Sequence, residues 1–488
     1  MGVRGFRVGW GGEASVDRRS FLRLGALAGA GGVLPSMAVG APPRGEASPR
    51  RGTARNVIFM VSDGMSFGTF SLADLACRAR RGRASHWASL FDRPGVRRSV
   101  QSTASADSLV TDSAAAASAW GGGRRVRNGS INVAADGRQS MPLLVRASQA
   151  GKATGLVTTT RVTHATPAGF IANVPSRNME QAIGEQILER RVDVALGGGS
   201  KFFPAEALKA HPDVTVVADR AGMLAGKVGP GRLLGLFASS HAPFELDRPE
   251  GVPTLAEMTA VALARLDAGA GGFVVQIEGG RVDHAAHSND APALVSEQLA
   301  FDDALGEVLR FVEGRDDTLV IVTTDHGNAN PGLTLYNQES FDGMARLARA
   351  RRSFEWIVGR LGAGADQAAR APGLIEEATG IALKEDERAI LTRAVEGRRV
   401  APFAALNNAT SVMGGLLANY FGVGFVSGNH TADDVELTAF GPGSERLTGA
   451  IENSAVHDLV CEALDLPPGK LLPGMDRVLE LKDSGRTD

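Results

Sequence analysis

The sequence contains little cysteine and almost no net charge. Its 488 residues include two cysteines, Cys77 and Cys461, which lie far apart and form no CxxC pair of the zinc or redox type. They could pair if the protein is exported, and two buried free thiols are the alternative. A net charge of −2 gives no argument for a nucleic-acid partner.

Aromatic residues are also scarce, at 5% of the chain, whereas glycine is abundant, with 61 residues. This composition indicates many tight turns in an α/β protein rather than disorder. Because 43% of the residues are hydrophobic, the chain can bury a sizeable core.

The N-terminal segment has the features of an export signal. The pair Arg18-Arg19 in "RRSFL" resembles a twin-arginine motif. The charge-free stretch at 24–43 contains five glycines and three prolines, so it is a poor membrane span and a good signal core, and "SMA" offers a cleavage site. We expect the Tat export machinery to export the protein and residues 1–41 to be removed, which leaves a periplasmic or secreted protein with no stable membrane span. Residues 42–54 are expected to form a flexible lead-in.

Short apolar runs alternate with helical segments along the chain. Each run is rich in Val and Ile and is closed by glycine or polar residues, as in strands buried on both faces of a parallel sheet. Helical patterns lie between them, for example at 179–190 and 291–313. This alternation predicts a doubly wound α/β/α sandwich around a central, mostly parallel sheet. The predicted strands lie within NVIFMVSDG (56–64), ATGLVTTTR (153–161), VDVALGGG (192–199), GFVVQIEGG (272–280), TLVIVTTDHG (318–327) and VELTAFGPG (435–443).

The pattern changes to charged helical sequence between residues 331 and 425. We interpret this stretch as a large, cap-like insertion that precedes the C-terminal strands. The catalytic domain then comprises residues 55–330 and 426–488.

Acidic residues and histidine follow three of the predicted strands. Asp63 follows one strand, Glu278 another, and Asp325-His326 a third. A single acid after a strand is usually a helix cap, but ligands bind at the carboxyl ends of parallel strands, so three such ends favour a metal site. Asp325 and His326 can reach the same ion only if their strand has already ended, because neighbouring strand residues point to opposite faces.

The stretch "EGGRVDHAAHSND" (278–290) has the densest group of such residues. Asp283 and His287 are four positions apart, which puts them on one face of a helix, and carboxylate with imidazole suits Zn²⁺. Exposed helices often contain such pairs by chance, so the position after a strand-end glutamate is what favours a metal. Of the nine histidines, five have motif-like contexts (His164, His284, His287, His326, His430) and four are interpreted as ordinary (His86, His211, His241, His457).

The stretch "VTDSAAAASAWGGG" (110–123) predicts a buried helix that begins with three polar residues. Asp112 or Ser113 could simply cap the helix. Alternatively, Ser113 is a nucleophile at a helix N-terminus, which is a favourable place for an anion. The stretch alone does not decide between the two.

Taken together, five segments resemble the alkaline phosphatase family. The resemblance runs from about residue 56 to 465, and 331–425 is too divergent to align. The segments are, in order, the nucleophile segment DSLVTDSAAAASAWGGGRRVRNG, the phosphate-arginine segment TRVTHATPAGFIANVPSR, and the metal segments EGGRVDHAAH, TTDHGN and GNHTADDVELTAFGPG.

The resemblance implies two Zn²⁺ ions and one Mg²⁺ ion. Mixed imidazole and carboxylate ligands suit Zn²⁺, and oxygen ligands suit Mg²⁺. The implied ligands are Asp283, His287 and His430 for one zinc; Asp63, Asp325 and His326, with the Ser113 oxygen, for the second zinc; and Asp63, Thr166 and Glu278 for magnesium.

The resemblance also implies a reaction, the hydrolysis of small-molecule phosphate monoesters through a phosphoserine. Ser113 would be the nucleophile, activated by the second zinc, and Arg177 would hold two phosphate oxygens in its planar fork. We expect Asp112 to cap and orient the helix rather than to act on the substrate. Family members are often homodimers, so a dimer is expected by resemblance.

Two histidines depart from the best-known bacterial pattern of the family. His164 stands where that type has an aspartate near the third metal, and His284 stands where it has a lysine; both resemble the animal-type arrangement near the phosphate. We predict looser Mg²⁺ binding and a more alkaline optimum than in the aspartate/lysine type. His284 could instead be a solvent-facing neighbour of a ligand.

Three other functions compete with the phosphatase hypothesis. A sulfatase needs a C/S-x-P-x-R context, and the three alanines after Ser113 disfavour it. A phosphodiesterase of the same superfamily often carries threonine at the nucleophile position. A non-catalytic zinc- or phosphate-binding protein has no need of a serine beside the second metal.

Overall fold

The computed structural model describes residues 53–225, 231–362 and 366–466. The expected signal at 1–41 and most of the expected lead-in at 42–54 lie outside these residues. Within the described ranges, no helix is both long enough and apolar enough to cross a membrane.

The central sheet has ten strands, and seven consecutive ones are parallel. Strand β13 is antiparallel to both of its neighbours. In spatial order the strands are β14 (Ala450–Glu452), β2 (Arg97–Ser102), β13 (Val435–Phe440), β8 (Thr318–Thr323), β1 (Asn56–Val61), β7 (Phe273–Glu278), β3 (Ala153–Arg161), β4 (Val194–Gly198), β6 (Arg232–Leu236) and β5 (Val214–Val217). Two short antiparallel pairs are β9 (Gly327–Asn328) with β12 (His430–Thr431), and β10 (Gly332–Leu333) with β11 (Val423–Gly424).

All six predicted strands are present, and the mostly parallel sheet is confirmed. Four further strands of the main sheet were not predicted. Strand β2 reads RRSVQS and is partly exposed, so it lacks the apolar run used for the prediction. Strands β5 and β14 are only four and three residues long, whereas β6 is a buried apolar run of five residues, RLLGL, that the sequence analysis missed.

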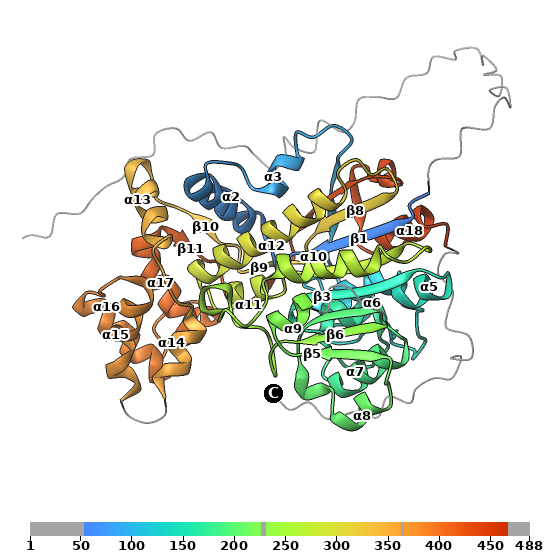
Figure 1. Cartoon of the computed structure of the whole chain (residues 1–488). Helices are drawn as coiled ribbons and strands as arrows, with labels where there is room; N and C mark the ends of the chain where they lie inside the picture. Colours follow the sequence, from blue (N-terminus) through green and yellow to red (C-terminus); the bar gives the residue numbers. More distant parts are fainter. Residues whose placement is uncertain (1–52, 226–230, 363–365, 467–488) are drawn as a thin grey trace, which may run out of the picture. The chain divides into compact units, whose positions relative to one another are not determined.

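Helices cover both faces of the sheet, because its strands are apolar on both sides. In β1, Val57 and Phe59 join one core cluster, whereas Ile58 and Met60 join the other. The first face is covered by α4 (Ser113–Gly122), α5 (Leu143–Gln149), α6 (Ala165–Ile171), α7 (Glu180–Glu189) and α18 (Ala455–Ala463). The second is covered by α3 (His86–Leu90), α9 (Arg220–Ala225), α10 (Leu255–Leu266), α11 (Arg281–His287) and α12 (Ala291–Phe311). The α/β/α sandwich is therefore confirmed (Figure 1).

Helices α4 and α6 approach each other unusually closely because small residues line their contact. A Cβ atom on Gly121 would lie 1.9 Å from the carbonyl oxygen of Gly169, and one on Gly169 would lie 2.5 Å from Cβ of Ala117. The ring of Phe59 in β1 lies 5.2 Å from Trp120 of α4 and 5.1 Å from Phe170 of α6. The alanines of α4 thus allow two helices to pack tightly over the centre of the sheet.

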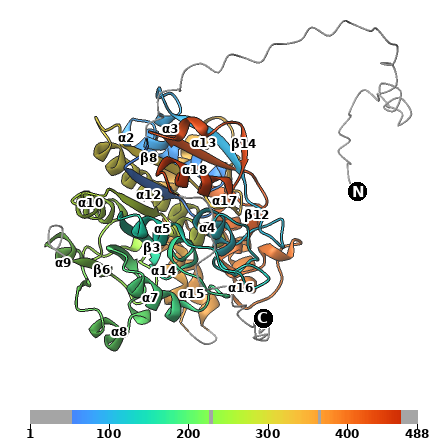
Figure 2. The ribbon, with the colours of Figure 1, turned by 90° about the vertical axis from the view of Figure 1, so that its right-hand side faces the viewer.

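The described residues of 331–425 form mainly helices with a third hydrophobic core. This core includes Leu347, Ile357, Ile375, Leu391 and Met413, and it extends onto the sandwich. Figures 1 and 2 both show α15 and α16 side by side. The helices that contribute are α2 (Phe67–Arg81), α12, α13 (Asn337–Leu347), α14 (Phe354–Leu361), α15 (Gln367–Thr379), α16 (Glu385–Val395) and α17 (Ala409–Phe421). The 3₁₀ turn η3 (Ala404–Leu406) also lies within 331–425, whereas α8 (Ala205–Lys209) and the 3₁₀ turns η1 (Ser200–Phe202), η2 (Glu245–Asp247) and η4 (Ser444–Arg446) lie outside it.

The two cysteines are buried free thiols. Cys77 on α2 belongs to the third core, whereas Cys461 on α18 belongs to the first face of the sandwich. The structure therefore has two free thiols rather than a disulfide between Cys77 and Cys461.

Candidate active site

The candidate site lies at the carboxyl ends of three neighbouring strands, β8, β1 and β7. Asp63 follows the end of β1, Glu278 is the last residue of β7, and Asp325 follows the end of β8. All three carboxylates are buried. Parallel pairing brings these strand ends to one edge of the sheet, as the sequence predicted.

Asp283, His287 and His430 form the first potential metal group. Helix α11 puts Asp283 and His287 on one face, and His430 arrives on β12. Nε2 of His287 lies 3.3 Å from Oδ2 of Asp283, and Nε2 of His430 lies 3.4 Å from Oδ1. The two Nε2 atoms are 3.0 Å apart.

Backbone carbonyls fix the tautomers of these two histidines. Nδ1 of His287 donates to the carbonyl oxygen of Gly428 at 2.7 Å, and Nδ1 of His430 donates to that of Thr111 at 2.8 Å. Because a carbonyl only accepts, each neutral ring carries its proton on Nδ1 and directs a lone pair from Nε2 at its neighbour. Two converging lone pairs beside a carboxylate fit a zinc ion.

Asp63, Asp325 and His326 form the second potential group. Nε2 of His326 lies 3.1 Å from Oδ2 of Asp325 and 3.7 Å from Oδ1 of Asp63. Strand β8 ends at Thr323, so Asp325 and His326 are free of its alternation and can face the same point. The loop is tight, because a Cβ on Gly64 (φ +70°) would lie 2.6 Å from Oδ1 of Asp283.

The third group contains Asp63, Glu278 and His164. The hydroxyl of Thr166 donates to Oδ2 of Asp63 at 3.3 Å, so the residues expected around magnesium also lie together. Glu278 accepts from the hydroxyl of Thr158. His164, which the sequence placed near the third metal, is part of this group.

The buried carboxylates need a cation. Burial, and then the charges of Asp325, Asp283 and Glu278, raise the pKa of Asp63 well above its ordinary value. Burial and Asp325 likewise raise the pKa of Glu278 to about 7. Within the described part of the chain, Oδ1 of Asp63, Oδ2 of Asp325 and Oε1 of Glu278 are buried without a hydrogen-bond partner. A divalent cation would remove both the repulsion and the unmet hydrogen-bonding capacity, so the residues fit the implied metals.

Ser113 is the first residue of α4, and its hydroxyl faces the second group. Asp112 is the N-cap, since its Oδ1 accepts from the backbone N–H of Ala115 at 2.9 Å. Ser113 Oγ lies 3.3 Å from Nε2 of His326. The cap interpretation therefore holds for Asp112, while the Ser113 hydroxyl is free for another role.

Arg177 lies between Asp112 and His164. Its Nη1 donates to Oδ2 of Asp112 at 3.0 Å, and its Nη2 donates to Nε2 of His164 at 3.1 Å. Its backbone N–H donates to the carbonyl oxygen of Gly129. The guanidinium fork is thus held next to the nucleophile candidate and the third metal group.

Comparison with known proteins shows the family to which the chain belongs. The family model described as alkaline phosphatase matches residues 54–466. The chain belongs to the alkaline phosphatase family. It is 29% identical to alkaline phosphatase 3 of Bacillus subtilis, with 88% of this chain and 94% of the relative covered. It is 34% identical to streptomycin-6-phosphate phosphatase of Streptomyces griseus, with 74% and 91% covered.

Solved structures agree with this assignment. Alkaline phosphatase of Thermus thermophilus has a TM-score of 0.80 and 34% identity, over 88% of this chain and 97% of that one. The cold-active enzyme of a Shewanella species has a TM-score of 0.71 and 26% identity, over 84% and 99%. This chain is therefore a phosphatase of the alkaline phosphatase family with a metal-binding site.

One histidine of the alkaline phosphatase site was not recognised in the sequence. The ring of His241, which the sequence analysis interpreted as ordinary, lies 4.4 Å from that of His284 and 5.5 Å from that of His164. His241 follows β6, a strand that was itself not predicted. Recognition of β6 would have placed His241 beyond a strand's carboxyl end, where the other candidates lie.

His284 is half-buried and does not simply face solvent. Its Nδ1 accepts from Nη1 of Arg281 at 2.7 Å, and Nη2 of Arg281 donates to Glu355 of α14 at 2.6 Å. His284 therefore belongs to a hydrogen-bonded chain that reaches the helices of 331–425.

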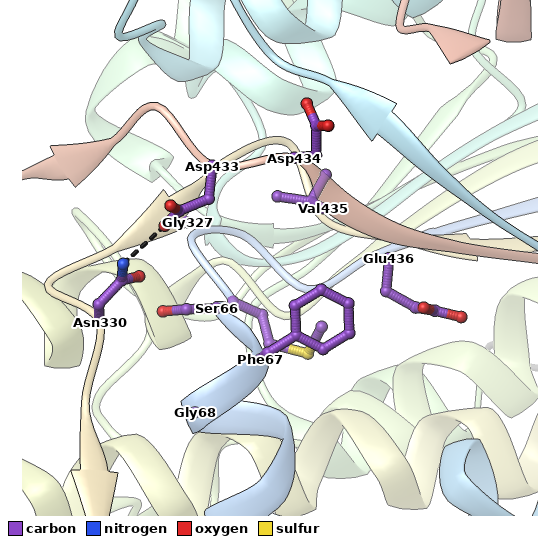
Figure 3. Close-up of a pocket in the computed structure, with 10 residues that line it drawn as sticks. Ser66, Phe67, Gly68, Gly327, Asn330, Asp433, Asp434, Val435 and Glu436 are labelled. Carbon is purple, nitrogen blue, oxygen red and sulfur yellow. Dashed lines mark hydrogen bonds between the residues drawn. The ribbon is translucent and has the colours of Figure 1, made fainter. Parts of the chain in front are cut away.

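A second pocket, of about 470 Å³, lies next to the segments that carry Asp63 and His326, since Met65 and Gly327 line it. It is lined by the start of α2, by Gly327 and by residues 433–436, and Figure 3 shows Asn330 hydrogen-bonded to Asp433 on one side. None of the predicted ligands lines it. The pocket is thus distinct from the candidate active site.

Proposed function

We propose that this phosphatase is exported and hydrolyses phosphate monoesters through a phosphoserine formed on Ser113. We propose further that Asp283, His287 and His430 hold one Zn²⁺; that Asp63, Asp325 and His326 hold the other; and that Asp63, Thr166 and Glu278 hold Mg²⁺. The observation that carries the proposal is the approach of Ser113 Oγ to Nε2 of His326, together with the hydrogen bond from Arg177 to Asp112, the residue before Ser113.

Binding of the substrate is assigned to Arg177 and to the N-terminus of α4. The fork of Arg177 matches two phosphate oxygens, and the free N–H groups of a ten-residue helix favour an anion. His164 and His284 complete the substrate-binding set. His164 is anchored by Arg177, and His284 by Arg281.

The reaction consists of two displacements at phosphorus. Ser113 Oγ attacks phosphorus as its hydroxyl proton is lost to solvent, the ester P–O bond breaks, and the leaving oxygen takes up a proton from water to give the alcohol. A water molecule then attacks the phosphoserine, which releases inorganic phosphate and restores the serine hydroxyl. The bound metals would supply Lewis acidity that favours the serine alkoxide and stabilises charge on the leaving oxygen.

The remaining parts of the proposal concern the whole protein. The twin-arginine sequence supports Tat export to the periplasm or beyond, and family resemblance supports a homodimer. The third hydrophobic core, to which most of the helices of 331–425 contribute together with α2 and α12, supports an insertion subdomain beside a catalytic domain of 55–330 and 426–488.

The test compares p-nitrophenyl phosphate with bis-p-nitrophenyl phosphate between pH 7 and 11. Metal-stripped protein is assayed before and after addition of Zn²⁺ and Mg²⁺. We expect zinc-dependent turnover of the monoester and far slower turnover of the diester. A faster diester reaction would indicate a phosphodiesterase, and bound zinc without turnover of either would indicate a binding protein.

A further inference from the structure

His241 occupies a place in the site that the proposed mechanism does not use. We propose that Glu180, Arg161 and His241 form a buttress that fixes the rings of His164 and His284, and that His241 is thereby a positioning residue for the phosphate. This inference rests on the proposed function, since it takes His164 and His284 as substrate-binding residues.

The base of the buttress is the ion pair between Glu180 and Arg161. Nε of Arg161 donates to Oε2 of Glu180 at 2.6 Å, and the hydroxyl of Thr163 donates to the same oxygen at 2.6 Å. The side chains of Arg161 and Glu180 are 16% and 12% exposed, so this pair is better shielded from water than an ordinary surface pair. Arg161 ends β3 and Glu180 begins α7, so both are anchored in regular elements.

Arg161 fixes the orientation of His241. Nη1 of Arg161 is hydrogen-bonded to Nε2 of His241. A guanidinium can only donate, so Nε2 accepts and the neutral ring carries its proton on Nδ1. Burial, with help from His284 and Arg161, lowers the pKa of His241 far below its ordinary value, which agrees with a neutral ring.

The loop that carries His241 is pressed against the ends of two strands. A Cβ on Gly198 at the end of β4 would lie 2.0 Å from the carbonyl oxygen of Ser240. The backbone N–H of Ala242 donates to the carbonyl oxygen of Thr159 in β3 at 3.0 Å. The backbone on both sides of His241 is therefore fixed by the sheet.

The ring of His241 packs edge to face against both substrate-binding histidines. The plane of the His241 ring makes an angle of 74° with the ring of His284 and of 78° with the ring of His164. The rings of His164 and His284 lie 5.7 Å apart, and the angle between their planes is 77°. Edge-to-face pairs are a favoured arrangement of aromatic rings. Truncation of His241 would leave a gap beside the rings of His164 and His284 and remove the packing that holds both in place.

Each of the three imidazoles is also bound to its own arginine. Arg177 donates to His164, Arg161 to His241 and Arg281 to His284. This pairing limits rotation of every ring but does not stop the rings from tilting. The mutual packing around His241 supplies that second constraint.

The test uses the full chain loaded with Zn²⁺ and Mg²⁺ and compares four variants with the wild type. The variants are His241→Ala, His241→Phe, Glu180→Gln and the control His211→Ala. His211 is another half-buried histidine beside an arginine, since its Nδ1 lies 3.4 Å from Arg232, but it lies far from the site along the sheet, beside β5. The readouts are kcat and KM for p-nitrophenyl phosphate, and the Kd of inorganic phosphate by calorimetry.

We expect His241→Ala to raise KM and the phosphate Kd by about fivefold to tenfold, with a smaller change in kcat. A change of this size corresponds to the net contribution of about one hydrogen bond. His241→Phe should recover most of the affinity because it keeps the edge-on ring. Glu180→Gln should shift both constants in the direction of His241→Ala, and His211→Ala should leave them unchanged.

Wild-type KM and Kd in His241→Ala would overturn the inference, as would a His241→Phe variant no better than His241→Ala. If His241→Ala fails to fold, KM and the phosphate Kd of His241→Phe and Glu180→Gln test the inference instead. If the wild type binds phosphate but turns over no monoester, the proposed function fails, and the phosphate Kd still tests the buttress.

Discussion

The carboxylate of Asp112 holds both the helix of Ser113 and the side chain of Arg177. Its Oδ1 accepts from the N–H of Ala115 at 2.9 Å, and its Oδ2 lies 3.0 Å from Nη1 of Arg177. The same Oδ2 accepts from the N–H of Gly129 at 2.9 Å. One side chain thus sets the distance between the proposed nucleophile and the proposed phosphate ligand.

Two substitutions of Asp112 should separate these tasks. Asp112→Asn keeps a capping oxygen but loses the charge that holds Arg177, so KM should rise while Tm changes little. Asp112→Ala should raise KM as well and also lower the free energy of unfolding by about 1 kcal/mol, the usual cost of a lost cap. Steady-state kinetics and thermal melts measure both effects, and an unchanged KM in both variants would contradict the assignment.

Removal of the Ser113 hydroxyl should abolish turnover without loss of metal. Ser113→Ala should lower kcat by at least about a thousandfold, since no other nucleophile is proposed. Metal content by elemental analysis should be unchanged. The control is Ser118→Ala on the same helix, whose hydroxyl donates to the carbonyl oxygen of Ala114 at 2.7 Å; that variant should lose stability but keep activity.

His164→Asp should tighten magnesium binding. His164 shares a group with Asp63 and Glu278, and a carboxylate in its place would add a hard oxygen to that group. We expect about a tenfold lower Kd for Mg²⁺ and a less alkaline optimum. A magnesium titration of the zinc-loaded protein measures the Kd, and equal affinity in wild type and variant would show that His164 does not loosen the third metal.

The contact between α4 and α6 should tolerate no added methyl group. Gly169→Ala would place Cβ 2.5 Å from Cβ of Ala117, so we expect a loss of about 1–3 kcal/mol in the free energy of unfolding and a lower kcat/KM, because α4 carries Ser113. Gly359→Ala on α14 is the control. A Cβ there meets nothing within 4 Å, so stability should rise by up to about 1 kcal/mol. Equal effects of the two substitutions would refute the close contact.

The buried Glu297 should make stability depend on pH. Burial raises its pKa from 4.5 to about 8, although the N–H of Glu245 bonds to its carboxyl group. Between these values the folded protein keeps a proton that the unfolded chain has lost. The stabilising contribution is therefore complete below pH 4.5 and is lost as pH rises through about 8, by at most about 1.4 kcal/mol per pH unit.

Glu297→Gln should remove this dependence. The free energy of unfolding of the variant minus that of the wild type, measured in urea, should be greater at pH 9 than at pH 6. Glu307→Gln serves as the control, because Glu307 lies on the same helix, is partly exposed and pairs with Arg310. The same pH difference in both variants would argue against a special role of Glu297.

Most of the strands that the sequence predicted have nearly continuous apolar runs, although β6, with the run RLLGL, was missed. Strands β1, β3, β4, β7 and β8 are buried on both faces, so their composition alone marks them. Strand β2 has exposed arginines on its outer part, and its role in the sheet depends on pairing with β13. No local pattern reports such a pairing.

The site shows the same division between local and tertiary information. Asp283 and His287 could be paired from their helical spacing, and the family motifs indicated the remaining proposed ligands. His241 has no spacing relationship to His164 or His284 and meets them only through the packing of the loop after β6. The dual role of Asp112 was likewise hidden, because its bond to Arg177 joins segments that are distant in the chain.

The candidate metal groups draw on nearly the whole catalytic sequence, from Asp63 after the first strand to His430 near the last. His430 reaches Asp283 only after the chain has passed through the helices of 331–425 and returned to pair β12 with β9. A chain that has not yet completed this return has at most a partial ligand set. Tight zinc binding would then report completed folding, and a polypeptide truncated before residue 430 should bind the metal poorly even where its sheet has formed.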